Sequence, residues 1–371
     1  MSALERLVGD PAHFLSETYG GTASITVSGR DFSSLGSLDH FDHLINDTLL
    51  PAAAFRMVRG GSPLPVRSYT RRFKGHGDDS IRIADPALVF DWFASGATIV
   101  LESMHRYSVE MRELCRELEN VLRQRTQVNA YITPPNAQGF ATHVDSHDVF
   151  VVQLHGRKHW IVHPPEDPDG EGDALIERDL VSGDCLYIPK GFAHAATTST
   201  EASAHLTIGL LPTTAGDIAR EVTDILKLSS ATPAVRSREA GEVADEVIAH
   251  LQDRVASVDR AELTRRLDRL FFTTRHHSLR GQLNRMLDAE KLSDPDKLVT
   301  RVEWLRYDDG DETVVVLPDR ELRFGARLRP ALDVVLRDEP FDVADLAAHL
   351  DEGDRRALVA RLMREGLLEL R

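Results

Sequence analysis

Short apolar segments separated by turn residues fill the middle of the chain. Val, Ile, Leu, Tyr and Trp dominate these segments, and Gly, Pro, Asp or Ser residues recur between them. Such segments are typical of β-strands. We predict strands over residues 127–135, 140–145, 149–156, 158–165, 174–184, 185–191 and 203–211. A succession of short strands with turns about every 8–12 positions indicates an all-β barrel or sandwich.

Helical patterns accompany a few strands in the first part of the chain. Helices are expected over 3–9, over 11–19, in a segment ending at Ile45, and over 85–96 and 108–125; strands are expected over 54–59 and 97–103. In the helix over 108–125, Met111, Leu114, Leu118 and Leu122 recur with a helical period. Gly96 is expected to end the helix over 85–96.

After Pro212 the pattern changes to long helices, which are expected over 215–228, 240–256 and 260–290. These helices form either a packing layer or a dimerisation surface. The C-terminal part returns to short strands over 302–309, 312–318 and 321–325, followed by helices over 329–338, 342–350 and 351–370. Its ending resembles a winged-helix unit. We therefore predict an α+β protein with domains at 1–213, 214–298 and 299–371.

Composition narrows the classes of partner. The 371 residues carry a net charge of −15, which argues against binding a phosphate backbone over a broad surface. Residues 301–371 hold 17 acidic residues against 12 Lys and Arg, so the winged-helix segment is expected to contact protein or to be structural, with no direct DNA binding. Two cysteines, no signal-peptide pattern and no long apolar stretch predict a cytoplasmic protein that does not bind membranes.

Candidate metal ligands crowd into residues 140–163, which hold five histidines and two aspartates. Side chains alternate along a strand, so His143 and Asp145 point to one face. His194, at the start of a later strand after a Pro/Gly turn, is the best candidate for a third ligand. Two histidines and one carboxylate on one side of an ion form the facial triad of non-heme Fe(II) oxygenases, whereas zinc prefers a closed tetrahedral set.

A cosubstrate would need a second group in the same barrel. Oxygenases of this type usually bind 2-oxoglutarate, whose far carboxylate requires a buried cation. Lys158 shares a strand face with Trp160, and Arg157 shares the opposite face with His159. We interpret the Lys158 face as the one that enters the barrel.

Three runs taken together, 129–165, 183–196 and 203–210, resemble the Jumonji-C ribosomal oxygenases, cupin-fold hydroxylases that modify ribosomal proteins. The resemblance implies a double-stranded β-helix barrel, a helical dimerisation region and a C-terminal winged helix. It implies an Fe(II)- and 2-oxoglutarate-dependent homodimer that uses O2 to hydroxylate a protein side chain. It places the iron ligands at His143, Asp145 and His194. It places cosubstrate or near-metal positions at Lys158, Asn129 and Tyr131, with Thr207 as the nearest hydroxyl to Gly209, where eukaryotic members carry a serine.

The remaining histidines and acids of the region are interpreted as bystanders. His147, at a probable bend, is expected next to the metal ligands or at the rim without binding the metal, and Asp148 is expected at a rim or turn. His155 and His159 are expected in solvent, and His163 at a strand end. His205 is a candidate for the interior, and Cys185 is expected to be a buried structural thiol.

Three alternatives stay open. The same iron chemistry could act on a natural-product peptide or a small molecule, or remove N-methyl groups from lysine. The chain could be a non-catalytic dimeric cupin scaffold, which the complete triad disfavours. It could also be another metal-dependent cupin enzyme, which would need more histidines and a glutamate but no buried lysine.

Overall fold

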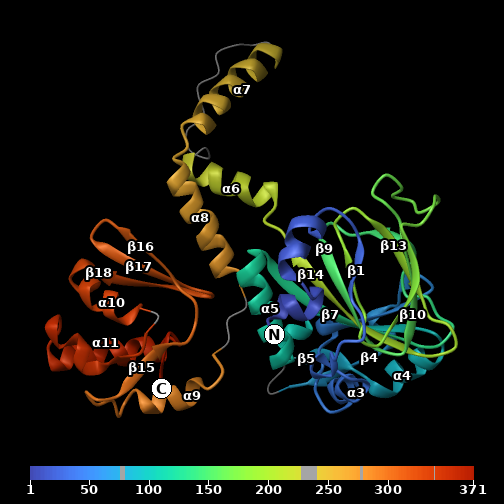
Figure 1. Cartoon of the computed structure of the whole chain (residues 1–371), viewed down its shortest axis with the longest axis horizontal. Helices are drawn as coiled ribbons and strands as arrows, with labels where there is room; N and C mark the ends of the chain where they lie inside the picture. The colour runs from blue at the N-terminus through green and yellow to red at the C-terminus, as the bar shows by residue number, and fades with distance from the viewer. Residues whose placement is uncertain (76–79, 227–239, 276–278, 338) are drawn as a thin grey trace. The chain divides into compact units, whose positions relative to one another are not determined.

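The computed structural model describes residues 1–75, 80–226, 240–275, 279–337 and 339–371. The chain divides into two compact units, 1–212 and 213–371 (Figure 1). The further boundary expected between 298 and 299 lies inside the second unit and stays a prediction. In the described residues, no helix combines the length and apolar character needed to cross a bilayer.

Two antiparallel sheets form the barrel of the first unit. Their strand orders are β1-β12-β9-β14-β7-β6-β2-β3 and β11-β10-β13-β8. The strands are β1 (Ser24–Val27), β2 (Phe55–Arg59), β3 (Ser62–Pro63), β6 (Thr98–Leu101), β7 (Arg125–Thr133), β8 (His143–Val144), β9 (Asp148–His155), β10 (Arg157–Val162), β11 (Ile176–Val181), β12 (Cys185–Ile188), β13 (Ala193–Thr197) and β14 (Ser203–Leu211). Each strand predicted between 127 and 211 has a counterpart, so the cupin-like barrel is confirmed.

The apolar run of β9 reflects burial on both faces of the large sheet. Phe150 and Val152 belong to a core shared with the N-terminal helices, whereas Val149 and Val151 pack with Trp160 between the two sheets. All five side chains are at most 4% exposed. Burial of such a side chain stabilises the fold by roughly 1.5–3 kcal/mol.

Helices cover the outer face of the large sheet. They are α1 (Ala3–Val8), α2 (Pro11–His13), the π-helical turn η1 (Phe14–Thr18), α3 (Leu38–Asn46), α4 (Pro86–Ala94) and α5 (Val109–Leu122), with 3-10 turns η2 (Ser33–Leu35), η3 (Ala52–Ala54), η4 (Val66–Ser68) and η5 (Met104–Arg106). Ser108 caps α5 by accepting from the Met111 N–H, and α5 ends where Arg123 adopts a left-handed φ of +54°. The hairpin β4 (Thr70–Lys74) with β5 (Ser80–Ala84), and strand β1, were not predicted, whereas β13 begins next to His194 as expected.

The second unit combines helices with two three-stranded sheets, β19-β15-β20 and β16-β17-β18. Its elements are α6 (Ala215–Leu226), α7 (Ala240–Ala256), α8 (Arg260–Thr273), α9 (Gln282–Asp288), β15 (Lys297–Thr300), β16 (Leu305–Asp309), β17 (Glu312–Leu317), β18 (Arg320–Gly325), η6 (Ala326–Leu328), α10 (Arg329–Val335), β19 (Phe341–Asp342), η7 (Val343–Ala348), α11 (Glu352–Arg364) and β20 (Leu368–Leu370). Apolar residues of α10, α11, β17 and β18 share one core.

Three helix predictions in this unit were wrong. The helix expected over 260–290 ends at Thr273, and a separate helix starts after Gly281, whose φ of +79° cannot continue a helix. Residues 343–348 form a 3-10 helix, and the last helix ends at Arg364 before Gly366 at φ +81°. The end of the helix expected over 215–228 lies outside the described residues.

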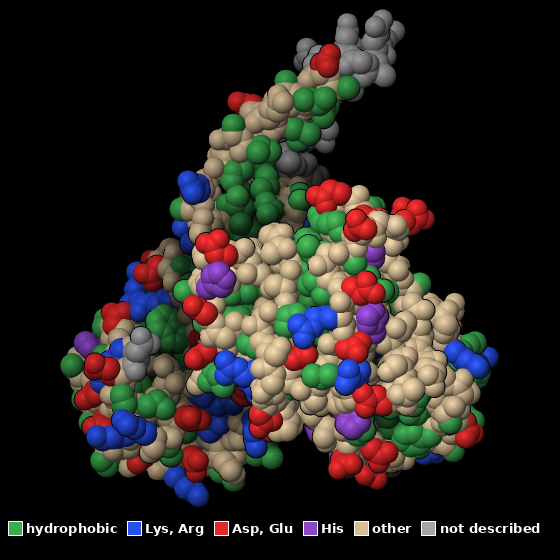
Figure 2. All heavy atoms as spheres, turned by 45° about the vertical axis from the view of Figure 1, so that its right-hand side comes forward, with side chains coloured by type: hydrophobic (Ala, Val, Ile, Leu, Met, Phe, Trp, Pro, Cys, Tyr) green, Lys and Arg blue, Asp and Glu red, His purple; other side chains and the backbone are tan. Residues whose placement is uncertain are grey.

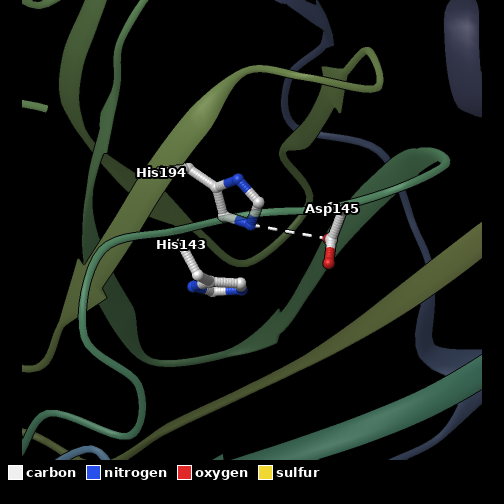
Figure 3. Close-up of side chains that lie close together, drawn as sticks. All are labelled: His143, Asp145 and His194. Carbon is white, nitrogen blue, oxygen red and sulfur yellow. Dashed lines mark ion pairs between the residues drawn. The ribbon is translucent and has the colours of Figure 1, made fainter. Parts of the chain in front are cut away.

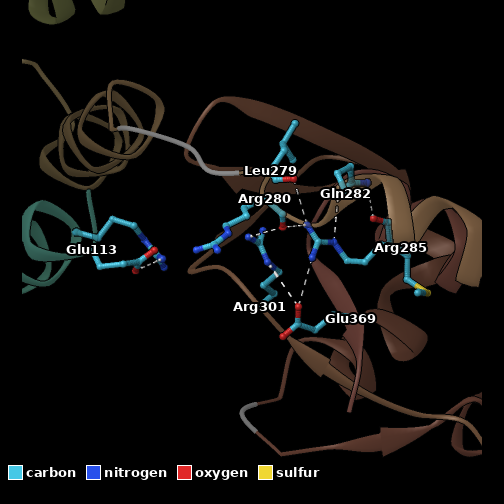
Figure 4. A network of polar contacts seen from close by, with 9 residues as sticks. Glu113, Leu279, Arg280, Gln282, Arg285, Arg301 and Glu369 are labelled. Carbon is cyan, nitrogen blue, oxygen red and sulfur yellow. Dashed lines mark hydrogen bonds and ion pairs between the residues drawn. The ribbon is translucent and has the colours of Figure 1, made fainter. Parts of the chain in front are cut away.

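An arginine network joins α9 to the sheet beneath it (Figure 4). Arg285, 7% exposed, donates to the carbonyl of Arg280 at 2.5 Å, and its Nη1 lies 3.5 Å from a carboxylate oxygen of Glu369 on β20. Arg301 donates to the same carbonyl of Arg280 and approaches the same carboxylate. A buried guanidinium needs several acceptors, so this network ties the short helix α9 to the core.

Candidate active site

Two histidines and an aspartate converge inside the barrel. His143 on β8 lies directly opposite His194 on β13 in the antiparallel register, and Asp145 follows the end of β8. One ligand atom from each of the three side chains lies within 4.8 Å of the other two, and His194 Nε2 is 3.7 Å from Asp145 Oδ2 (Figure 3). The residues singled out from sequence spacing therefore meet at one point.

A hydrogen bond at Nδ1 explains the orientation of each imidazole ring. His143 Nδ1 lies 2.9 Å from the Ala141 carbonyl, and His194 Nδ1 lies 3.0 Å from the Phe192 carbonyl. A carbonyl can only accept, so both Nδ1 atoms carry the proton and both Nε2 lone pairs are available. Burial, together with nearby His143, lowers the pKa of His194 and favours the neutral ring. This donor set of two imidazole nitrogens and one carboxylate fits an Fe(II) ion.

A cavity of about 280 Å³ adjoins the cluster. Its walls come from β7, β9, β10 and β14, together with Arg56 and Phe140. The lining residues are Arg56, Gln127, Asn129, Tyr131, Phe140, His143, Asp145, His147, Val149, Val151, Lys158, Trp160, His194, Ala196, His205, Thr207, Gly209 and Leu211. All seven residues predicted for the site line it.

Lys158 forms the closed end of the cavity. Its side chain is buried and donates from Nζ to Thr133 Oγ1 at 3.1 Å. Burial lowers the pKa of Lys158 to about 7. No carboxylate bonded to its ammonium is recorded in the described part of the chain. A ligand carboxylate would satisfy this group and restore its charge.

Two more polar atoms at this end lack partners. Among the described residues, Trp160 Nε1 and His205 Nδ1 are buried without a hydrogen bond. His205 stacks on Tyr131 with ring centroids 4.9 Å apart, and burial, then Lys158, holds its pKa well below the usual value. Buried polar groups are normally satisfied, so this end fits an oxygen-rich ligand such as a dicarboxylate.

Asn129 is held in one orientation. Its Oδ1 accepts from the Ser103 N–H at 2.9 Å and from Gln127 Nε2 at 3.0 Å, so its amide nitrogen is directed elsewhere. Ser103 adopts a left-handed φ of +55°, which a non-glycine residue rarely does. Thr207 pairs with Asn129 across the strands and hydrogen-bonds Tyr131.

The expected bystanders mostly lie outside the cavity. His155 is exposed, His159 Nδ1 lies 2.9 Å from Asp179 on the outer face, and His163 contacts Asp167. Cys185 is buried, and burial raises its pKa to about 12. Asp148, the first residue of β9, accepts hydrogen bonds from Tyr187 Oη and from the Lys190 N–H.

Sequence reasoning missed several of the residues that line the cavity. Gln127 could have been found, because it lies two residues before Asn129 on the same strand face. His205, a candidate for the interior from its sequence, lines the cavity, and so does His147. Arg56 and Phe140 come from distant segments and carry no local signal.

Part of the chain is similar in sequence to known proteins. Residues 103–218 match the JmjC domain family. Ribosomal oxygenase 1 of Danio rerio is 35% identical over 166 residues, which is 41% of this chain and 30% of that protein. The bifunctional lysine-specific demethylase and histidyl-hydroxylase NO66 of Drosophila melanogaster is 32% identical over 140 residues, or 34% of this chain and 21% of that protein. The match thus spans less than a third of these relatives.

Solved structures share the fold along nearly the whole chain. The Escherichia coli ribosomal oxygenase YcfD superposes with a TM-score of 0.60 at 16% identity, covering 98% of both chains. The same protein in complex with cobalt and 2-oxoglutarate gives a TM-score of 0.58 at 17% identity over 97% of both chains. Fold and site therefore define a cupin-like barrel that contains a JmjC domain at residues 103–218. Within the matched segments, the chain is similar to proteins named ribosomal oxygenase 1 and NO66.

Proposed function

We propose that this chain is an Fe(II)- and 2-oxoglutarate-dependent oxygenase that hydroxylates a side chain of a ribosomal protein. The observation that carries the proposal is the meeting of His143, Asp145 and His194 in the same cavity as buried Lys158. Two relatives named for ribosomal oxygenation and a related structure with cobalt and 2-oxoglutarate support it.

Different residues of the cavity would bind the metal ion and the cosubstrate. His143, Asp145 and His194 would hold the ion, which when bound supplies the O2 activation that couples decarboxylation of 2-oxoglutarate to C–H hydroxylation. Lys158 and Thr133 orient the far carboxylate of the cosubstrate. Trp160 Nε1 adds a donor, and the apolar walls exclude water.

Succinate release tests the chemistry. Purified protein with Fe(II) and 2-oxoglutarate is expected to form succinate, and His143→Ala is expected to abolish it because one ligand is lost. His159→Ala, on the outer face of β10, is the matched control. Intact-mass analysis of ribosomal proteins from cells lacking the gene should show a gain of one oxygen after incubation with the enzyme.

The other outcomes point to different functions. Failure of both the wild type and His159→Ala to form succinate would contradict the proposed enzymatic activity. Succinate without a mass gain would redirect the substrate to a natural-product peptide or small molecule. Loss of a methyl group from a lysine would indicate demethylation.

We also propose that the chain forms a homodimer through residues 214–298. Ile248, Leu251 and Val255 recur along α7 and are 53%, 38% and 50% exposed. Figure 2 shows hydrophobic side chains gathered along α7 near the top of the view. Apolar side chains spaced on one helix face are typical of a helix that packs against a partner.

The C-terminal residues 299–371 are proposed to be a winged helix that contacts protein. Their acidic charge balance disfavours DNA. We propose a cytoplasmic location, supported by the two free, buried cysteines, Cys115 and Cys185.

A further inference from the structure

Gly209 marks a point where two segments compete for the same space. A Cβ built on Gly209 would lie 2.7 Å from Nε2 and 2.9 Å from Cδ2 of His147. Real Cβ atoms do not come this close, so a side chain at position 209 would require the imidazole of His147 to shift. The glycine on β14 is therefore explained by the histidine that precedes β9.

The strand register shows how deep in the cavity this imidazole lies. Moving outward from Thr133, which holds Lys158, the inward positions of β7 face those of β14 in successive pairs. These pairs are Thr133 with Ser203, Tyr131 with His205, Asn129 with Thr207, and Gln127 with Gly209. Thr133 and Ser203 are buried, whereas Tyr131, Asn129, Thr207 and Gln127 are half-buried. His147 thus lies at the outer, Gln127 level.

The cosubstrate cannot span this length. Inward positions on one strand are about 7 Å apart, so the Gln127 level lies roughly 20 Å along the strand from the Lys158 level. A five-carbon dicarboxylate bound at Lys158 ends well before that point. A ligand at the level of Gln127 and His147 must therefore be a different molecule.

Both side chains at this level can bind such a molecule. In the described part of the chain, no hydrogen bond or ion pair is recorded for the imidazole of His147. Gln127 donates through Nε2 to Asn129 Oδ1, which leaves its carbonyl oxygen as an acceptor. His147 lies outside the group of three potential ligands, so it is not needed for the metal.

We propose that His147 contacts the primary substrate and, with Gln127, selects a protein side chain that carries a hydrogen-bonding group. This inference rests on the proposed function. Gly209 is the residue that makes room for the contact. At the Gln127 level of the cavity, the polar side chain therefore comes from His147, before β9, and not from position 209 on β14.

The kinetic test uses total ribosomal protein from cells lacking the gene, with hydroxylation read by mass. His147→Ala is expected to raise the KM for this substrate roughly tenfold, with a smaller change in kcat, because one hydrogen bond to bound substrate is lost. His155→Ala, exposed at the other end of β9, is the matched control. The anaerobic absorption of the Fe(II)·2-oxoglutarate complex should persist in His147→Ala.

A stability comparison tests the shared space. Gly209→Ala is expected to lower Tm by about 3 °C or more, because its methyl group overlaps the imidazole. The same substitution in the His147→Ala background should lower Tm far less. This readout requires no substrate.

The outcomes separate this inference from the proposed function. An unchanged KM in His147→Ala, with an active wild type, overturns the substrate contact alone. Loss of the Fe(II)·2-oxoglutarate absorption assigns His147 to the cosubstrate and also overturns it. A wild type that hydroxylates no ribosomal protein overturns the proposed substrate, and the contact proposed for it falls as well.

Discussion

At the scale of single residues, the closed end of the cavity couples cosubstrate binding to proton uptake. Burial lowers the pKa of Lys158 from 10.5 to about 7, so at pH 8 the amine of the empty protein is mostly neutral. A bound carboxylate favours the charged form. Binding of 2-oxoglutarate should therefore draw a proton from solvent at pH 8 and almost none at pH 6.

Calorimetry can measure this uptake. With Co(II) in place of iron, titration of 2-oxoglutarate in two buffers of different ionisation enthalpy should report about one proton at pH 8. Lys158→Arg is the control, because a guanidinium stays charged throughout. Equal uptake by the arginine variant would show that another group titrates.

The lowered pKa of Lys158 also determines the direction in which the unfolding free energy changes with pH. Between pH 7 and 10.5 the unfolded chain binds a proton at Lys158 that the folded, cosubstrate-free protein does not. The unfolding free energy contributed by this group therefore rises with pH in that window, and its destabilising effect is largest below pH 7.

At the scale of elements, the turn between β12 and β13 supports Asp145, one of the three proposed metal ligands. Asp148, at the start of β9, accepts from Tyr187 Oη at 2.6 Å and from the Lys190 N–H at 2.8 Å. The next residue of this turn, Gly191, donates from its N–H to the Asp145 carbonyl at 3.2 Å. Asp148 thus positions the backbone that carries Asp145.

Removing this support should weaken metal binding without removing a ligand. Asp148→Ala is expected to raise the Kd for Co(II) by at least about tenfold, as measured by absorbance titration. Asp179→Ala removes a carboxylate of the outer face that bonds His159 and should leave the Kd near the wild-type value. Equal Kd values for the two variants would contradict the positioning role.

At the scale of the whole molecule, the exposed face of α7 predicts the oligomeric state. Sedimentation should give twice the mass of the chain. Replacing Ile248 and Val255 together by Asp should yield monomers, because two charges would be buried in an apolar contact. Ala249→Asp, on the same helix but directed away from this face, adds a charge at another exposed position and should leave the dimer intact. A monomeric wild type would contradict the proposal.

Local patterns in the sequence predicted the strands, turns and strand faces, which depend on residues that are close together along the chain. Strand alternation put His143 and Asp145 on one face, and the Pro/Gly turn before His194 indicated a further ligand on the next strand. Most strands of the barrel followed from apolar runs. The helix start after Gly281 and the helix end before Gly366 were missed, because a glycine inside an amphipathic pattern does not reveal its φ.

Tertiary structure decided what depends on the register between distant strands. The direct pairing of His143 with His194, the level of each side chain along β7 and β14, and the overlap of His147 with position 209 come from inter-strand hydrogen bonds. The desolvation that lowers the pKa of Lys158 likewise comes from atoms contributed by several strands. The sequence alone thus predicted the three residues that meet in the cluster, His143, Asp145 and His194, whereas the packed barrel decided which other side chains share its cavity.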